Sequence, residues 1–135
     1  MLGVTPYVGV PGNCREAIEY YVTALGAELI FLQTVGESPM PEMGPAANIM
    51  HARLKIGDSY LMMSDDTRPD APAAGGNISL TLGLDDAAQA ARIFDLLAEG
   101  GEVVMPLTRT YWAEAFGIVK DRFGIAWMLN CEAPE

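Results

Sequence analysis

The chain repeats one pattern of secondary structure twice. Residues 13–32 and 87–106 each read as an amphipathic helix that stops at glycine and runs into a strand. Glu28 and Glu102, which open these two strands, lie about 74 positions apart, and the strands ahead of the helices keep the same spacing. A period of this length is too long for a solenoid repeat and indicates two copies of one supersecondary unit. The sequence therefore predicts two βαβββ modules that face each other across a shared cavity.

Turn and capping residues divide each half into its expected elements. Asn13, with Glu16 three residues later, has the pattern of a capping box at the start of the first helix, and Asp85 or Asp86 caps the second helix. Residues 57–58, a Gly-Asp pair, form a two-residue hairpin turn. The expected strands cover residues 4–10, 27–35, 49–56 and 59–64 in the first half, and 77–84, 102–108, 116–120 and 125–131 in the second.

Two segments fall outside this pattern. Residues 36–48 carry three prolines and no clear period, which is typical of either a lid or a loosely ordered loop. Residues 66–76, rich in proline, alanine, glycine and aspartate, mark the break between the modules. A chain of 135 residues has the size of one domain. We therefore expect a single domain, residues 1–135, made of modules at about 3–65 and 77–131 that the linker 66–76 joins.

Charge and composition exclude several classes of protein. The net charge of −10 argues against nucleic acid or an anionic membrane as a partner, because either would need a basic patch. No stretch reaches the ~18 apolar residues of a membrane span. The N-terminus lacks the pattern of a secretory leader, so we expect a cytoplasmic protein. The acidity leaves room for a cationic ligand, although solubility is its ordinary interpretation.

Two cysteines, Cys14 and Cys131, are too few for a disulfide framework. Cys14 occupies the first position of the expected helix, where the helix dipole lowers the pKa of a thiol. Two interpretations stay open for it. It is either a reactive thiol or a small apolar residue that packs under the start of the helix.

Alternation along the strands divides each of them between a core face and an open face. In residues 77–84 the apolar side chains, Ile78 among them, alternate with small polar ones; in residues 49–56 Met50 takes a core position. The open faces carry a mixture of small, polar and aromatic side chains, which suits a ligand pocket better than a packed core. Their members are Thr5, Tyr7, Gly9, Ile49, His51, Arg53, Lys55, Tyr60, Met62 and Ser64 in the first half, and Asn77, Ser79, Thr81, Gly83, Ala126, Met128 and Asn130 in the second.

Short pieces of sequence spread along the chain carry a family resemblance. They are Tyr7 with Gly12-Asn13-Cys14, Glu16-Ala17-Ile18, Tyr20-Tyr21, Leu25-Gly26-Ala27-Glu28, Met62-Met63-Ser64-Asp65, Trp112-Ala113, Phe116-Gly117, Asp121 through Gly124, and Trp127-Met128. Together they resemble the PhnB-like branch of the vicinal oxygen chelate superfamily, which has the glyoxalase/bleomycin-resistance/extradiol-dioxygenase fold. The resemblance covers residues 4–131. It implies an α+β fold in which paired βαβββ modules form a curved mixed sheet around a cavity, and it implies a homodimer.

In the metal-dependent members of that superfamily, side chains such as His, Glu or Gln from the first and last strands of each module hold one divalent ion. The corresponding positions here are Thr5, Met62, Asn77 and Met128. Hydroxyl, amide and thioether groups are poor ligands for such an ion. Methionine packs well against apolar ligands instead. We therefore expect no metal and no cofactor.

His51, the only histidine, lies with Arg53 on the predicted open face. One interpretation makes His51 a general base and lets Arg53 hold an anion. The other is an ordinary strand histidine at a dimer interface or under the proline-rich loop. Four aromatic residues can stack on an aromatic or planar ligand, or they are ordinary aromatics at a sheet or subunit seam: Tyr7, Tyr60, Tyr111 and Trp112.

The expected function is metal-free binding of a small molecule in the cavity between modules or between subunits. The alternative is an enzyme, either a lyase or isomerase with His51 as its base or a metal-dependent glyoxalase- or dioxygenase-type enzyme. His51 and Arg53 are the catalytic candidates. The expected ligand-binding residues are Thr5, Tyr7, His51, Arg53, Tyr60, Met62, Asn77, Ser79, Trp112 and Met128.

Overall fold

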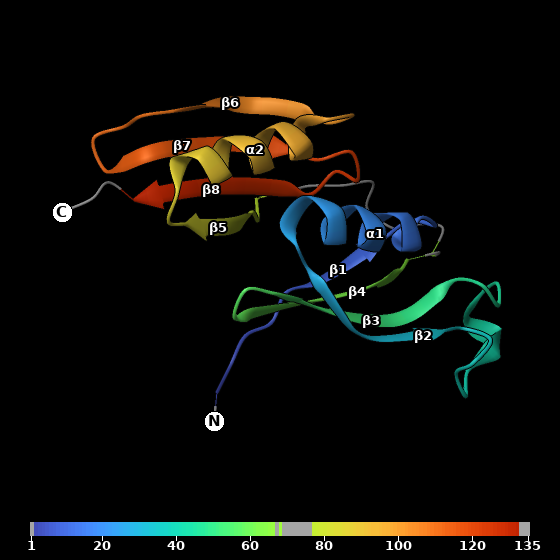
Figure 1. Ribbon diagram of the computed structural model, residues 1–135. Coiled ribbons are helices and arrows are strands. Elements are labelled where there is room, and N and C mark those ends of the chain that lie inside the picture. Colours follow the sequence, from blue (N-terminus) through green and yellow to red (C-terminus); the bar gives the residue numbers. More distant parts are fainter. Residues whose placement is uncertain (1, 67, 69–76, 133–135) are drawn as a thin grey trace. The chain divides into compact units, whose positions relative to one another are not determined.

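A computed structural model describes residues 2–66, 68 and 77–132. The chain divides into two compact units, Met1–Ala71 and Pro72–Glu135 (Figure 1). Most of the predicted linker lies outside the described residues, so the single domain stays a prediction. The first unit holds β1 (Tyr7–Val10), α1 (Cys14–Leu25), β2 (Glu28–Thr34), the short 3-10 helix η1 (Pro41–Met43), β3 (Ile49–Ile56) and β4 (Ser59–Asp65). The second holds β5 (Leu80–Leu84), α2 (Ala87–Ala98), β6 (Glu102–Thr108), β7 (Ala113–Lys120) and β8 (Ala126–Glu132).

The two units have the same topology, which confirms the internal repeat. Their strand orders are β1-β4-β3-β2 and β5-β8-β7-β6. In each sheet the first strand pairs in parallel with the last strand, and the remaining pairs are antiparallel. Tyr7 pairs with Met62 and Thr81 pairs with Met128, so equivalent residues stand in equivalent register. The predicted α+β fold of two βαβββ modules is therefore confirmed.

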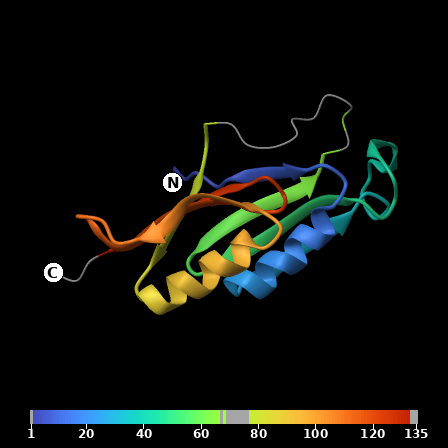
Figure 2. The ribbon, with the colours of Figure 1, turned by 90° about the horizontal axis from the view of Figure 1, so that it is seen from above.

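Each helix covers one face of its own sheet and contacts all four of its strands (Figures 1 and 2). The strand residues under the helices are buried at alternating positions, among them Leu61 and Met63 in β4 and Trp127 and Leu129 in β8. This confirms the predicted core parity of Trp127 and leaves the predicted open face on the other side of each sheet. None of the helices in the described part of the chain has the length and apolar character that crossing a membrane requires.

Several strand ends differ from the prediction because pairing depends on the partner strand. β1 begins at Tyr7, just after Pro6, which has no N–H to donate to the sheet. β5 begins at Leu80 because its partner β8 begins only at Ala126. Ile78, predicted for the core, therefore lies ahead of the strand and is 78% exposed.

The capping box predicted at Asn13 is wrong, because its side chain makes no capping hydrogen bond. The N–H of Cys14 donates instead to Oδ1 of Asp65 at the end of β4, at 2.9 Å. Oδ2 of Asp65 accepts from the N–H of Ile49 at 2.7 Å, so one carboxylate joins the starts of α1 and β3. In the second unit, Asp86 caps α2 through its side chain, as predicted.

A β-bulge reverses the predicted faces of Ile49 and Met50. Gln33 pairs with His51 while Thr34 pairs with Ile49, so Met50 is an extra residue in the ladder. Ile49, predicted for the open face, is buried, and Met50, predicted for the core, lines a pocket. The prediction was wrong at both positions because strict alternation assumes uninterrupted pairing.

The carboxylate of Asp121 organises the turn between β7 and β8. Its Oδ1 accepts from the N–H groups of Phe123 and Ile125, at 2.9 and 3.1 Å. Its Oδ2 accepts from the indole Nε1 of the buried Trp127 at 2.8 Å. Asp121 is itself buried, so these three charge-assisted bonds form where water does not compete with them. They confirm that residues 121–124 form a turn.

We expect Asp121→Ala to lower the free energy of unfolding by about 3 kcal/mol, because the indole and two backbone donors lose their acceptor in a buried site. Urea denaturation followed by circular dichroism measures this change. Asp95→Ala, at an exposed position of α2, is the matched control and should change the free energy by less than about 0.5 kcal/mol. Equal midpoints for the two variants would contradict the structural role of Asp121.

Candidate functional site

Four side chains, one from each strand, form a row across the open face of the first sheet. Phe31 pairs with Arg53, Arg53 pairs with Met62, and Met62 pairs with Tyr7. Paired residues on adjacent strands project from the same face of a sheet. Leu61 and Met63, on either side of Met62, are buried on the face that α1 covers, so the row lies on the opposite face.

Aromatic rings contact Arg53 of this row and His51, the second basic side chain on the same face. The ring of Tyr7 stacks on the imidazole of His51 with centroids 5.6 Å apart, and the ring of Phe31 lies 5.8 Å from it. The Tyr7 hydroxyl is 3.3 Å from Nδ1 of His51. The guanidinium of Arg53 lies 4.4 Å from the centroid of the Tyr60 ring, a cation–π contact. We call these five residues the His51 cluster.

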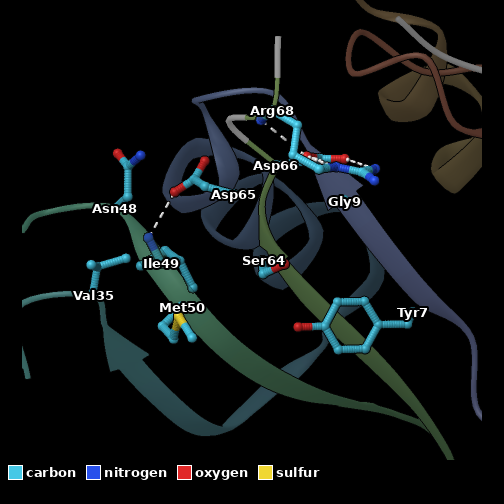
Figure 3. A pocket seen from close by; sticks show the side chains of 10 residues that line it. All are labelled: Tyr7, Gly9, Val35, Asn48, Ile49, Met50, Ser64, Asp65, Asp66 and Arg68. Atoms are coloured by element: carbon cyan, nitrogen blue, oxygen red, sulfur yellow. Dashed lines mark hydrogen bonds and ion pairs between the residues drawn. The ribbon is translucent and has the colours of Figure 1, made fainter. Parts of the chain in front are cut away.

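A cavity of about 480 Å³ adjoins the cluster within the first unit (Figure 3). Tyr7 belongs to both, and we call the cavity the Tyr7 pocket. In Figure 3 the ring of Tyr7 lies at one end of the pocket and the Asp66–Arg68 pair at the other, with Ser64 between them. The lining residues are Tyr7, Gly9, Val35, Asn48, Ile49, Met50, Ser64, Asp65, Asp66 and Arg68.

An ion pair forms one end of the pocket. Nε and Nη2 of Arg68 donate to the two carboxylate oxygens of Asp66, at 2.9 and 2.8 Å. The hydrogen bonds from the Arg68 side chain lower the pKa of Asp66 below its ordinary value. Gly9 leaves the space that this carboxylate occupies, because a Cβ there would lie 3.1 Å from Cβ of Asp66.

The base of the loop 36–48 forms another wall of the pocket. The N–H of Val35 donates to the carbonyl of Asn48 at 2.8 Å, and the N–H of Gly36 donates to the carbonyl of Ala46 at 3.0 Å. These bonds close the loop at its base and hold Val35 and Asn48 against the pocket.

The second sheet presents an equivalent face with different chemistry. Met128, at the register position of Met62, pairs with Ile118, so an apolar side chain stands where the first sheet has Arg53. The hydroxyl of Thr81 lies 3.8 Å from Sδ of Met128. Within the described residues, Oδ1 of Asn130 is buried without a hydrogen-bond partner.

The remaining predicted site residues lie apart from the His51 cluster. Thr5 precedes β1, and Asn77 and Ser79 precede β5; all three are exposed. Trp112 lies just before β7, and its ring packs edge-on against that of Phe116 with ring centroids 5.3 Å apart. Their roles as ligand-binding residues stay predictions.

Sequence reasoning missed several residues that the structure brings to this site. Phe31 was missed because it lies in a continuous apolar run, and Ile30 is an extra residue in the ladder between β2 and β3. Asp66 and Arg68 belong to the segment that was predicted as a linker, and Met50 was assigned to the core. The two adjacent aspartates at the end of β4, Asp65 and Asp66, were the feature of the sequence that indicated polar groups at this end of the pocket.

At the positions that the family resemblance predicts as metal ligands, the donor set does not fit a divalent ion of the zinc or nickel type. Those positions carry Thr5, Met62, Asn77 and Met128. Such ions take imidazole, carboxylate or thiolate ligands, and none of these four side chains supplies one. In the part of the chain that the structure describes, no three His, Cys, Asp or Glu side chains gather into a group that could hold a metal.

Comparison with known proteins establishes the family. Residues 6–129 match the Glyoxalase/Bleomycin resistance protein/Dioxygenase superfamily, and the chain belongs to it. It is 37% identical to protein YjdN of Escherichia coli K12, over 94% of this chain and 93% of that protein. The crystal structure of protein PA1353 from Pseudomonas aeruginosa is similar, with a TM-score of 0.86, 45% identity and coverage of 98% of each chain. The PhnB protein from Bacillus cereus shares the fold, with a TM-score of 0.82, 20% identity and coverage of 96% of this chain and 99% of that one.

Cys14, at the start of α1, is fully buried. Burial raises the pKa of its thiol to about 12, and the nearby carboxylate of Asp65 adds to the rise. These effects outweigh the helix dipole, which acts in the opposite direction. The structure therefore favours the small packed residue over the reactive thiol.

We expect Cys14 to react with 5,5′-dithiobis(2-nitrobenzoate) about 1,000-fold more slowly at pH 8 in the folded protein than in urea, because a pKa near 12 leaves that much less thiolate than the ordinary value of 9.0. The Cys131→Ala variant isolates this thiol. The Cys14→Ala variant reports on Cys131, which is also free and buried. Folded and unfolded rates within tenfold of each other for Cys14 would contradict the burial argument.

Proposed function

We propose that this protein binds a small organic molecule on the open face of its first module, with the His51 cluster and the Tyr7 pocket as the site. The observation that carries the proposal is the cavity of about 480 Å³ beside a stacked aromatic cluster. This volume falls within the range of small-molecule sites, which combine apolar walls with a few fixed polar groups. The aromatic rings supply the apolar area, and the two basic side chains and Ser64 supply the polar groups.

We propose further that binding needs no metal. The thioether of Met62 lies in the row beside Tyr7, where it supplies a polarisable contact for an apolar ligand. The exposed rings of Tyr7 and Phe31 support enclosure of the ligand between the modules, or between the subunits of a homodimer. We place this protein in the cytoplasm, as the sequence predicted.

A second candidate function is that of a lyase or isomerase with His51 as general base and Arg53 holding an anionic group. The contact between the Tyr7 hydroxyl and Nδ1 of His51 favours it, because such a contact fixes the tautomer of the ring. We prefer binding, because no carboxylate supports His51 as a base in the described part of the chain. The one titratable side chain that hydrogen-bonds His51 there is Tyr7.

Native mass spectrometry of the protein as purified, before and after addition of excess nickel and zinc, tests this function. We expect a dimer that takes up no specific metal, and a retained small molecule gives the mass of the ligand. One metal ion per chain, held against mild chelation, would contradict metal-free binding. It would favour a metal-dependent glyoxalase- or dioxygenase-type enzyme instead.

Installing metal ligands tests whether the four positions are assigned correctly. The variant with Thr5→His, Met62→Glu, Asn77→His and Met128→Glu should gain at least 100-fold in nickel affinity, because imidazole and carboxylate ligands then replace hydroxyl, amide and thioether groups. Isothermal titration calorimetry measures the gain, and alanine at the same four positions is the control. Unchanged nickel affinity would count against the assigned positions.

A further inference from the structure

The open face of the first sheet gathers basic side chains in a strongly acidic chain. The sequence has 8 lysines and arginines against 18 aspartates and glutamates. His51, Arg53 and Lys55 nevertheless occupy alternate positions of β3, and alternate residues of a strand project from the same face. The local charge of this face is therefore opposite to the net charge of the chain.

The guanidinium of Arg53 contacts an aromatic ring and is not paired with a carboxylate among the described residues. In the described part of the chain it makes no ion pair, and its contact is with the ring of Tyr60 at 4.4 Å. Stacking uses the flat side of a guanidinium and leaves the N–H groups on its edge available. Those groups form the fork that matches the two oxygens of a carboxylate or a related oxyanion.

His51 adds a donor to the same side of the sheet. When the Tyr7 hydroxyl donates to Nδ1 at 3.3 Å, the proton of the neutral ring lies on Nε2. The stacked ring of Tyr7 and the ring of Phe31 restrict its orientation. In that tautomer the imidazole offers one N–H on the same side of the sheet as Arg53.

The carboxylates near this face are already engaged or lie opposite another charge. Both oxygens of Asp65 accept backbone N–H groups, and both oxygens of Asp66 accept from Arg68. Glu28 stands opposite Lys55 in the ladder between β2 and β3, where it offsets the charge of that lysine. Arg53 is left as the cation of the face without a carboxylate opposite it.

The equivalent face of the second sheet lacks this chemistry. Ile118 pairs with Met128 at the register position where Arg53 pairs with Met62. Thr81 stands where the first sheet has Tyr7. The cationic group therefore belongs to one module and is not a general property of the repeated fold.

From these observations we propose that the site takes an aromatic organic anion, either a carboxylate or a phosphonate. Arg53 and His51 hold the oxyanion, while the rings of Tyr7, Phe31 and Tyr60 contact the planar part of the ligand. This inference rests on the proposed binding function and names its class of ligand. The local charge of the face decides the sign of the ligand, because solvent and salt screen the more distant carboxylates of the chain.

Four probes of similar size and different charge test this class of ligand: benzoate, phenylphosphonate, benzyl alcohol and benzylammonium. Their dissociation constants are measured by NMR titration of the isotope-labelled protein at low salt. We expect at least one of the two anions to bind at least tenfold more tightly than benzyl alcohol. A hydrogen bond between charged groups raises affinity by about tenfold or more. Whether benzoate or phenylphosphonate binds more tightly distinguishes a carboxylate from a phosphonate ligand.

Two arginine variants of equal charge separate the site from the net charge. Arg53→Gln should reduce the preference for the anion over benzyl alcohol to less than twofold. Arg92→Gln, at an exposed position of α2, is the control and should keep the preference. Arg53→Lys retains the charge but loses the fork, and an intermediate preference is expected. Circular dichroism checks that each variant is folded.

Four results would overturn the inference. Equal affinity for the anions and for benzyl alcohol leaves the binding function standing but removes its anionic specificity. Tightest binding of benzylammonium means that the net acidity, and not Arg53, selects the ligand. Loss of the preference in both Arg53→Gln and Arg92→Gln shows a nonspecific charge effect. Binding of none of the four probes to the first module contradicts the proposed function as well.

Discussion

Parallel pairing between the first and last strands of each module is the constraint on which the rest of the structure depends. In each module the helix leads from the first strand to the second, which lies at the opposite edge of the sheet. The last strand then fits between the first strand and its other neighbour, so the helix has to cross over the sheet. That helix covers one face of the four strands and makes it the core. The other face is therefore free of this packing requirement and can carry polar and charged side chains.

The link between Asp65 and two chain segments shows how the fold builds the first site. Its carboxylate accepts from the start of α1 and from the start of β3, so the helix, the strand end and the base of the loop 36–48 meet at one point. The Tyr7 pocket forms beside this junction. Asp121 has a comparable role in the second module, where it holds a turn and the buried indole of Trp127.

The two modules share one fold but differ in the side chains on their open faces. Met62 and Met128 occupy the same register position, and both modules keep the buried alternation beside it. The pairing partners on the open faces differ, since Arg53 beside Met62 corresponds to Ile118 beside Met128. Packing under the helix constrains one face of each sheet, whereas the other face carries cationic and aromatic side chains in the first module.

The sequence by itself determined the two modules, the two helices, most strand positions and the outward parity of Tyr7, Arg53 and Met62, because these follow from periodicity within single segments. Tertiary structure decided which of the outward-facing side chains contact one another. The stacking of Tyr7 on His51 joins residues 44 positions apart, and the bulge at Met50 depends on the pairing of β3 with β2. Such contacts are set by which strands become neighbours and in what register, and a local pattern of apolar and polar residues does not contain that information.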